Sequence, residues 1–265
     1  MLRFGMPSLT EAETVEQWAQ ICVKNDLQFV ELNMNFPQCQ LPALDADELN
    51  ALAEKYGIFF TVHLDDNLNI ADFNSYVAQA YQKTVLETIE IAKKANIPVL
   101  NMHLNRGAVY TLPERKLYFF EEFEEEYLSN ILAFRNACEE AIGCSNVRIC
   151  VENTTGYLPF MQKAAALLIE SPVFALTYDI GHNLCTGGMD EPWILENEKE
   201  LRHMHMHDAK APTKDHLALG NGDLDIPYYR ELARKHDCTV VLETKTLKAL
   251  SESVAWLKEK TLFAE

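Results

Sequence analysis

The sequence predicts a closed barrel of eight parallel strands and eight helices, a (β/α)8 fold of the α/β class. Short apolar runs alternate with longer amphipathic runs along the whole chain, eight times in all. Continuous apolar strands separated by helices are typical of a parallel sheet that is covered on both faces. Eight such units in 265 residues fit a closed barrel better than an open sheet. No stretch rich in Pro, Gly or Ser divides the chain, so we expect residues 1–265 to form a single domain.

The predicted strands are short and rich in the β-branched and aromatic residues that favour extended structure. FFTVH at residues 59–63 and TVVLE at residues 239–243 are two examples. In chain order the eight strands are expected at residues 2–6, 29–32, 59–63, 99–103, 148–152, 175–179, 203–207 and 239–243.

The predicted helices are placed by capping residues and by the lengths of the amphipathic runs. Ser8 or Thr10 can cap a first helix that ends near Asp26. Asp45 can begin a second helix and Gly57 can end it, because glycine readily adopts the left-handed conformation that closes many helices. The remaining helices are expected at residues 73–95, 114–142, 159–170, 191–200, 227–235 and 251–260.

Composition narrows the class of protein. Hydrophobic residues make up 48% of the chain and charged residues 24%, which is typical of a globular protein. The formal net charge is −17 and no cluster of Lys and Arg is present, which argues against nucleic-acid binding. No apolar stretch is long enough for a signal peptide or a membrane span. The seven cysteines are scattered without a Cys-x-x-Cys pair, which indicates reduced thiols and a cytoplasmic protein. Hydrophobic residues on the outer helices could support a homo-oligomer.

Residues 201–223 hold four of the eight histidines. His203, His205 and His207 alternate with methionines, so in a strand their imidazoles would share one face. Aspartates and glycines follow in the same segment, together with His216. Several imidazoles on one strand that runs into a carboxylate-bearing loop predict a metal site. For His203 we expect packing, or solvent contact at the far end of the barrel.

Six consecutive predicted strands end in an imidazole or a carboxylate. The carboxyl ends of barrel strands meet on one face, where barrel enzymes place their active sites. A divalent cation would compensate several carboxylates that are costly to desolvate alone. The candidate ligands are Glu152, Asp179, His205 and Glu243, a set that suits Mn²⁺, Co²⁺, Mg²⁺ or Zn²⁺. The other strand-end residues are His63, His103 and His207. All three are expected to bind substrate, and His207 fits either a pocket wall or a ligand.

Three further residues are predicted at the same mouth as substrate-binding groups. A turn after Asp179 brings His182 back over the strand ends, where it could bind a substrate oxygen or a second ion. His216 could reach the mouth from the seventh loop, and Lys210 lies free in that loop. No organic cofactor is expected, because no G-x-G-x-x-G motif follows a strand and no G-x-x-x-x-G-K motif occurs.

Five motifs in this order resemble the xylose-isomerase-like barrel superfamily of sugar isomerases and epimerases, which also contains endonuclease IV. They are VENTTG (151–156), YDIGH (178–182), HMHDAK (205–210), HLALGNGDLD (216–225) and VLETK (241–245). The resemblance covers nearly the whole chain and implies the same fold.

The tagatose- and psicose-epimerase branch implies a particular set of roles. One divalent ion would be held by Glu152, Asp179, His205 and Glu243, and the two glutamates would serve as the acid/base pair. His182 matches a histidine that contacts substrate in that branch. The branch also has an arginine in the seventh loop that this chain lacks, and Lys210, Lys214 or His216 could replace it.

The endonuclease IV branch implies an alternative, a zinc-dependent phosphodiesterase that cuts abasic DNA. Its three zinc ions would draw on eight residues of this chain: His63, His103, Glu152, Asp179, His182, His205, His216 and Glu243. Lys214 stands where that branch has an aspartate, and the acidic loop LDDNLNIAD after His63 would repel phosphate.

The sequence therefore favours an isomerase or epimerase of a small sugar or sugar-like substrate. The reaction would remove a proton next to a metal-polarised carbonyl and pass through an enediolate. A barrel that binds a metal or sugar without catalysis is the third hypothesis, which the pair of glutamates disfavours.

Overall fold

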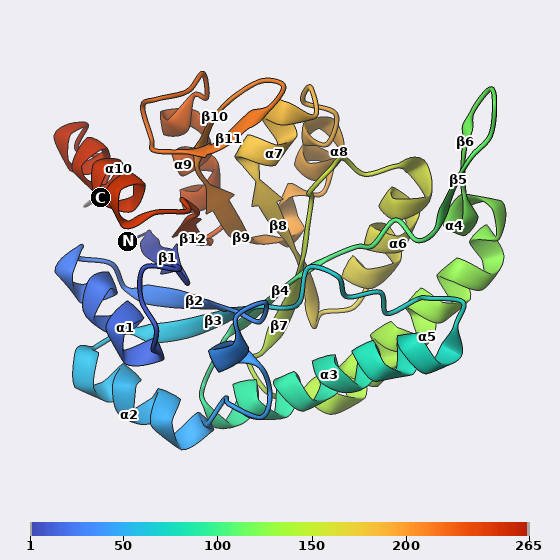
Figure 1. Cartoon of the computed structure of the whole chain (residues 1–265), viewed down its shortest axis with the longest axis horizontal. Coiled ribbons are helices and arrows are strands. Elements are labelled where there is room, and N and C mark those ends of the chain that lie inside the picture. The colour runs from blue at the N-terminus through green and yellow to red at the C-terminus, as the bar shows by residue number, and fades with distance from the viewer. Residues whose placement is uncertain (1, 264–265) are drawn as a thin grey trace.

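The computed structural model describes residues 2–263 and confirms the predicted barrel. Eight parallel strands close in the order β1-β12-β9-β8-β7-β4-β3-β2, with helices around the outside (Figure 1). The barrel strands are β1 (Arg3–Pro7), β2 (Phe29–Asn33), β3 (Phe59–His63), β4 (Val99–His103), β7 (Arg148–Glu152), β8 (Phe174–Asp179), β9 (Leu201–Met206) and β12 (Thr239–Leu242). Pairing of β1 with both β2 and β12 closes the sheet and leaves no free edge in the barrel.

The helices follow the strands as the β-α alternation predicts. In Figure 1, α3 and α5 run side by side along the bottom of the molecule. The helices are α1 (Val15–Lys24), α2 (Ala46–Tyr56), α3 (Ser75–Lys94), α4 (Phe119–Glu122), α5 (Glu124–Ile142), α6 (Pro159–Ile169), α7 (Ile180–Cys185), α8 (Glu191–Glu196), α9 (Ile226–Lys235) and α10 (Leu247–Glu259), with 3-10 turns η1 (Pro37–Cys39) and η2 (Glu198–Glu200).

Two short hairpins lie outside the barrel. The first pairs β5 (Val109–Thr111) with β6 (Lys116–Tyr118) and projects from the body near α4 (Figure 1). The second pairs β10 (Asp208–Lys210) with β11 (Lys214–Leu217) after β9. The prediction of one helix over residues 114–142 is therefore wrong at its start. The part before residue 119 forms a strand whose backbone groups pair with β5, and a break at Phe123 separates α4 from α5.

Other boundaries moved for local reasons. The first helix does not begin after Ser8 or Thr10. It begins after Thr14. The Thr14 side chain accepts a hydrogen bond from the Gln17 backbone N–H, and the Gln17 side chain accepts one from the Thr14 backbone N–H. The last helix begins at Leu247, before the predicted residue 251, because the Thr246 side chain caps it. His207 and Glu243 lie one residue beyond their strands.

Both predicted ends of α2 are confirmed. The Asp45 side chain accepts from the backbone N–H groups of Asp47 and Glu48, and Gly57 ends the helix in the left-handed conformation with φ of 66°. A side chain at position 57 would meet no atom within 4 Å of its Cβ, so only the backbone conformation there requires glycine.

Gly57→Ala is therefore a clean test of backbone strain. We expect the variant to lower the free energy of unfolding by about 1 kcal/mol, because alanine resists positive φ while no clash is added. Urea denaturation followed by circular dichroism measures the change. An unchanged unfolding midpoint would mean that this turn relaxes to another conformation.

The interior of the barrel is polar at one level. Four side chains from four strands, Glu31, Thr61, His203 and Thr239, are buried there together. Outside the strands, the core is apolar and includes Trp18 of α1. Among the described residues, every helix is too short or too polar to cross a bilayer. All seven cysteines are free thiols.

Candidate functional site

The four predicted metal ligands meet at the carboxyl ends of neighbouring strands. Glu152 ends β7, Asp179 ends β8, His205 lies in β9 and Glu243 follows β12. One donor atom from each lies within 4.8 Å of the others. The residues are nearly inaccessible, with exposed fractions of 1%, 0%, 0% and 7% in that order. The barrel therefore concentrates three carboxylates and one imidazole in a space shielded from water.

His205 lies at the centre of this cluster. Its Nδ1 is 3.3 Å from Glu152 Oε1, 3.2 Å from Glu243 Oε2 and 3.9 Å from Asp179 Oδ2. Neither ring nitrogen of His205 makes a hydrogen bond of good geometry to any described residue, and nor does Glu243 Oε2. His205 Nδ1 thus faces the gap among three carboxylates and is not directed at any one of them.

The electrostatics of the cluster require positive charge at its centre. Burial opposes ionisation of Glu152, but the nearby His205 and His103 hold the pKa of its carboxyl well below the usual range. Burial likewise opposes ionisation of Glu243, and His205 and Lys245 hold its pKa low. The converse holds for His205, where burial lowers the pKa but the carboxylates of Glu152 and Glu243 raise it well above the usual value. The buried carboxylates thus favour a cation bound among these side chains.

These residues fit a divalent cation. Three carboxylates and one imidazole form a mixed oxygen and nitrogen donor set of the kind that binds Mn²⁺, Co²⁺, Mg²⁺ or Zn²⁺. The unpaired Nδ1 of His205 and Oε2 of Glu243 are buried donor atoms that an ion would satisfy.

The side chains around Glu152 hold it in place. Asn101 Nδ2 donates to Glu152 Oε2, and the same oxygen lies 3.2 Å from His103 Nε2 and 3.4 Å from His63 Nε2. Asn101 is itself fixed by the Thr177 hydroxyl, which donates to Asn101 Oδ1 over 2.6 Å. The structure therefore brings the predicted His63 and His103 against Glu152. Burial lowers the pKa of His63, yet Glu152 raises it overall to about 9.

His207 contacts Asp179 and thereby joins the cluster at its edge. The His216 backbone N–H donates to His207 Nδ1 over 2.8 Å, so the ring hydrogen is on Nε2. That nitrogen lies 3.1 Å and 3.2 Å from the two oxygens of Asp179. The ring packs against the backbone at Gly181, where an added Cβ would be only 1.9 Å from His207 Cε1. His207 thus lies beside Asp179, and it also offers a donor atom within 4.8 Å of donor atoms of His182 and His216, so it fits both a pocket wall and a ligand.

His182 and His216 lie at the mouth, where their side chains are partly exposed. His182 Nδ1 is 3.6 Å from Asp179 Oδ2, and His216 Nε2 is 3.6 Å from Glu243 Oε2. The two rings contact each other at a centroid distance of 5.3 Å. His182 Nδ1 and His216 Nε2 are buried atoms that have no hydrogen-bond partner among the described residues.

Lys210 is not brought to this cluster. It lies exposed at the end of β10, away from the residues that line the neighbouring cavity. A different lysine, which the sequence reasoning did not single out, takes that place: Lys245 Nζ is 2.7 Å from Glu243 Oε1. The motif VLETK contains both partners, and their spacing of two residues was the signal available in the sequence.

Glu31 is the main residue that the sequence reasoning missed. It lies in the middle of β2, buried inside the barrel, and contacts both His203 and His205. His203 is fully buried, which confirms the packing alternative for that residue and not the solvent one.

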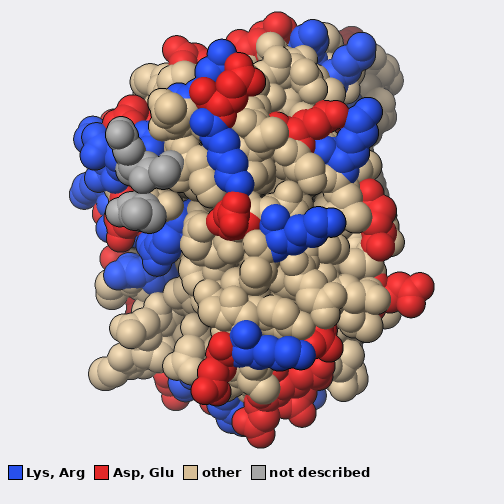
Figure 2. Space-filling model, turned by 90° about the vertical axis from the view of Figure 1, so that its left-hand side faces the viewer, with Lys and Arg blue, Asp and Glu red and all other residues tan. Residues whose placement is uncertain are grey.

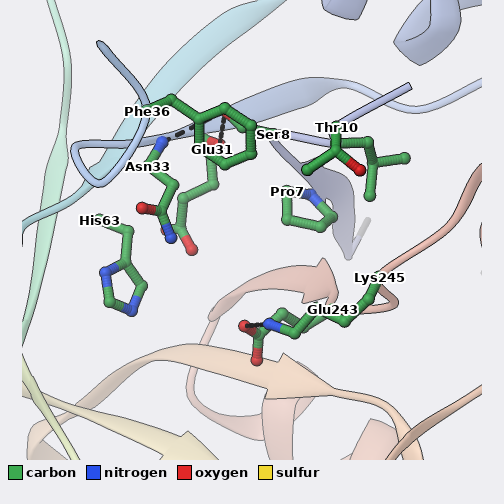
Figure 3. A pocket seen from close by; sticks show the side chains of 10 residues that line it. Pro7, Ser8, Thr10, Glu31, Asn33, Phe36, His63, Glu243 and Lys245 are labelled. Atoms are coloured by element: carbon green, nitrogen blue, oxygen red, sulfur yellow. Dashed lines mark hydrogen bonds and ion pairs between the residues drawn. The ribbon is translucent and has the colours of Figure 1, made fainter. Parts of the chain in front are cut away.

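A cavity of about 220 Å³ adjoins the cluster. Figure 3 shows Glu31, Asn33 and His63 on one side of it and Glu243 with Lys245 on the other. Its remaining lining comes from the β1 end and η1 region: Pro7, Ser8, Leu9, Thr10 and Phe36. Polar and apolar groups therefore share the walls, and the Glu243 carboxylate faces a space that can hold a small polar molecule.

Comparison with known proteins places the chain in a family. The sequence model of the xylose isomerase-like TIM barrel family matches residues 14–260. The chain belongs to this family. A relative is the uncharacterized protein MJ1614 of Methanocaldococcus jannaschii, 22% identical over 213 residues, which are 78% of this chain and 80% of that protein.

Two solved structures show the same fold. A D-tagatose 3-epimerase-like protein superposes with a TM-score of 0.79 at 20% identity and covers 98% of both chains. D-psicose 3-epimerase of Clostridium cellulolyticum, solved with D-tagatose, superposes with a TM-score of 0.75 at 14% identity and covers 100% of both chains.

At these identities the likeness to the solved structures shows the fold. Figure 2 shows one face of the molecule. On that face the described Lys and Arg side chains are interspersed with Asp and Glu around an uncharged area.

Proposed function

We propose that the protein is a divalent-metal-dependent isomerase or epimerase of a small sugar or a sugar-like substrate. One observation carries the proposal: two buried glutamates, Glu152 and Glu243, approach the same nitrogen of His205, at 3.3 Å and 3.2 Å. Their donor atoms lie within 4.8 Å of each other, so both carboxylates are close enough to act on one small molecule bound at the ion. The names of the solved neighbours support a sugar as the substrate class.

Glu152, Asp179, His205 and Glu243 would hold the ion. A bound divalent ion supplies Lewis-acid polarisation of a substrate carbonyl, which makes the neighbouring C–H more acidic. One glutamate then accepts that proton, and the substrate becomes an enediolate. The other glutamate first takes up a proton from solvent. It then donates this proton to the opposite face in an epimerisation, or to the neighbouring carbon in an aldose–ketose isomerisation.

The two glutamates have different surroundings. Glu152 is held by Asn101 and lies beside His103, with none of its surface in the cavity lining. Glu243 lines the cavity, and Lys245 fixes one of its oxygens while the other has no hydrogen bond. Substrate that enters through the cavity therefore meets Glu243 first. We assign Glu243 to proton transfer on the cavity side and Glu152 to the opposite side.

The groups around the cavity suit a polyol. His63 and Asn33 offer polar atoms to hydroxyl groups, while Phe36 offers an apolar wall to a C–H face. His182 and His216 have unpaired ring nitrogens at the mouth and are assigned to binding substrate oxygens. His103 and His207 act through Glu152 and Asp179, which they contact.

A deuterium-exchange screen tests this function. The chain is loaded with Mn²⁺ or Co²⁺ and incubated in D₂O with free and phosphorylated ketoses and aldoses. Proton NMR then follows the C–H next to each carbonyl. We expect one sugar class to lose that signal and to yield its epimer or isomer. Exchange in none of the sugars, with an ion bound, would indicate a barrel that binds without catalysis.

A further inference from the structure

A buried carboxylate lies on the far side of His205 from the proposed ion site. Glu31 comes from β2, and its side chain is 2% exposed. Glu31 Oε1 is 2.9 Å from His205 Nε2, and Glu31 Oε2 is 2.9 Å from His203 Nε2. The Thr61 hydroxyl also donates to Oε2 over 3.0 Å. Both carboxylate oxygens therefore have a polar neighbour.

Such a group is costly inside a barrel. The usual filling of this level is an aliphatic side chain, and an ionised carboxylate pays a large desolvation penalty there. Glu31 thus places a carboxylate where an apolar residue would serve stability, and its two oxygens contact His205, His203 and Thr61. This placement points to a role in the neighbouring site.

The two nitrogens of His205 face different partners. Nε2 faces Glu31, the one carboxylate within ion-pair distance of that atom among residues 2–263. Nδ1 faces Glu152, Glu243 and Asp179. A neutral imidazole carries its hydrogen on one nitrogen and a free lone pair on the other. A carboxylate beside Nε2 favours the hydrogen there, which leaves the lone pair on Nδ1.

His203 holds Glu31 in this orientation. The His203 ring lies between Glu31 and the Thr239 hydroxyl, with Nδ1 2.5 Å from Thr239 Oγ1. An ionised carboxylate only accepts hydrogen bonds, so His203 Nε2 carries a hydrogen and donates it to Glu31 Oε2 over 2.9 Å. This bond and the Thr61 hydroxyl occupy Oε2 and turn Oε1 toward His205.

We propose that Glu31 is a positioning residue that fixes the tautomer and the ring orientation of His205, so that Nδ1 is presented to the cation. The inference rests on the proposed function, because it needs an ion at the four-residue cluster. This role explains why Glu31, Thr61 and His203 are buried next to four ligands that already suffice to hold an ion. Carboxylates that orient metal-binding histidines act in this way in other proteins.

Metal affinity measures this role directly. Glu31→Gln keeps the shape and one acceptor oxygen but removes the charge beside Nε2. We expect Mn²⁺ or Zn²⁺ to bind the variant about 10–100-fold more weakly than the native chain, with one ion still bound per chain. Glu140→Gln is the matched control, since it makes the same chemical change at an exposed position of α5. Its affinity should stay within about threefold of native. Equal loss in both variants would mean that the loss is not specific to Glu31.

Ring-nitrogen NMR of the Zn²⁺-loaded native chain tests the tautomer and does not depend on a variant that folds. We expect the hydrogen of His205 on Nε2 and the ion on Nδ1, and the reverse assignment would overturn the inference. Failure of the two proposals is distinguishable. A native chain that binds no divalent ion overturns both, whereas native binding with unchanged affinity in Glu31→Gln overturns only the role of Glu31.

Discussion

Glu152→Gln and Glu243→Gln should each remove proton exchange while the protein stays folded. Glutamine keeps the size of the side chain but cannot accept a proton at neutral pH. General acid–base groups contribute about 10²–10⁴-fold to rate, which corresponds to about 3–5 kcal/mol of transition-state free energy. We therefore expect deuterium incorporation into the sugar to fall by at least about 100-fold in either variant. The measurement is initial-rate NMR in D₂O at saturating metal.

Glu140→Gln is the matched control for this pair, since it makes the same chemical change at an exposed position of α5. It should exchange at the native rate. Metal content must be measured in all three variants, because Glu152 and Glu243 are also proposed ligands. Full activity in either active-site variant would remove that glutamate from the mechanism.

Asp179→Asn is expected to have the largest effect on metal binding. The Asp179 side chain both faces the cluster and caps α7, where it accepts from the His182 backbone N–H over 2.7 Å. Asparagine can keep the cap but has no charge for the ion. We expect the affinity for Mn²⁺ or Co²⁺ to fall by more than about 100-fold, beyond the loss that removal of an orienting partner causes. Calorimetric titration of the metal-free protein measures this.

His236→Ala serves as the control for metal titration. His236 follows α9 and lies 3.3 Å from Glu198, and it is not part of the four-residue cluster. The His236→Ala variant should bind Mn²⁺ or Co²⁺ with the affinity of the native chain. If Asp179→Asn also binds with native affinity while α7 remains folded, Asp179 is not a ligand and the four-residue site is wrong.

The barrel could be predicted from the sequence because each strand carries its own signal. Parallel strands covered on both faces are continuous apolar runs, and their carboxyl ends must meet at one face of the barrel. For that reason the order of Glu152, Asp179, His205 and Glu243 along the chain was enough to predict that they converge. Local capping rules also placed both ends of α2 correctly.

What the sequence did not reveal depends on contacts between distant residues. Glu31 stands in the apolar run FVELN, and its partner His203 is 172 positions away, so nothing near Glu31 marks it as polar interior. The β5–β6 hairpin was missed because residues around 114 fit a helical pattern until the pairing with β5 is known. Lys210 and Lys245 both follow strand ends, and only the fold shows that Lys245 is the one that reaches Glu243.

Metal content per chain tests the central claim most directly. The purified, untagged protein is analysed for elements, dialysed against a chelator and reloaded with Mn²⁺, Co²⁺ or Zn²⁺. The four-residue site predicts one ion per chain that exchanges among these metals. No ion would contradict the account. Two or three tightly held zinc ions would contradict it as well, because His63, His103, His182 and His216 would then be ligands, and cleavage of abasic DNA would become the reaction to assay.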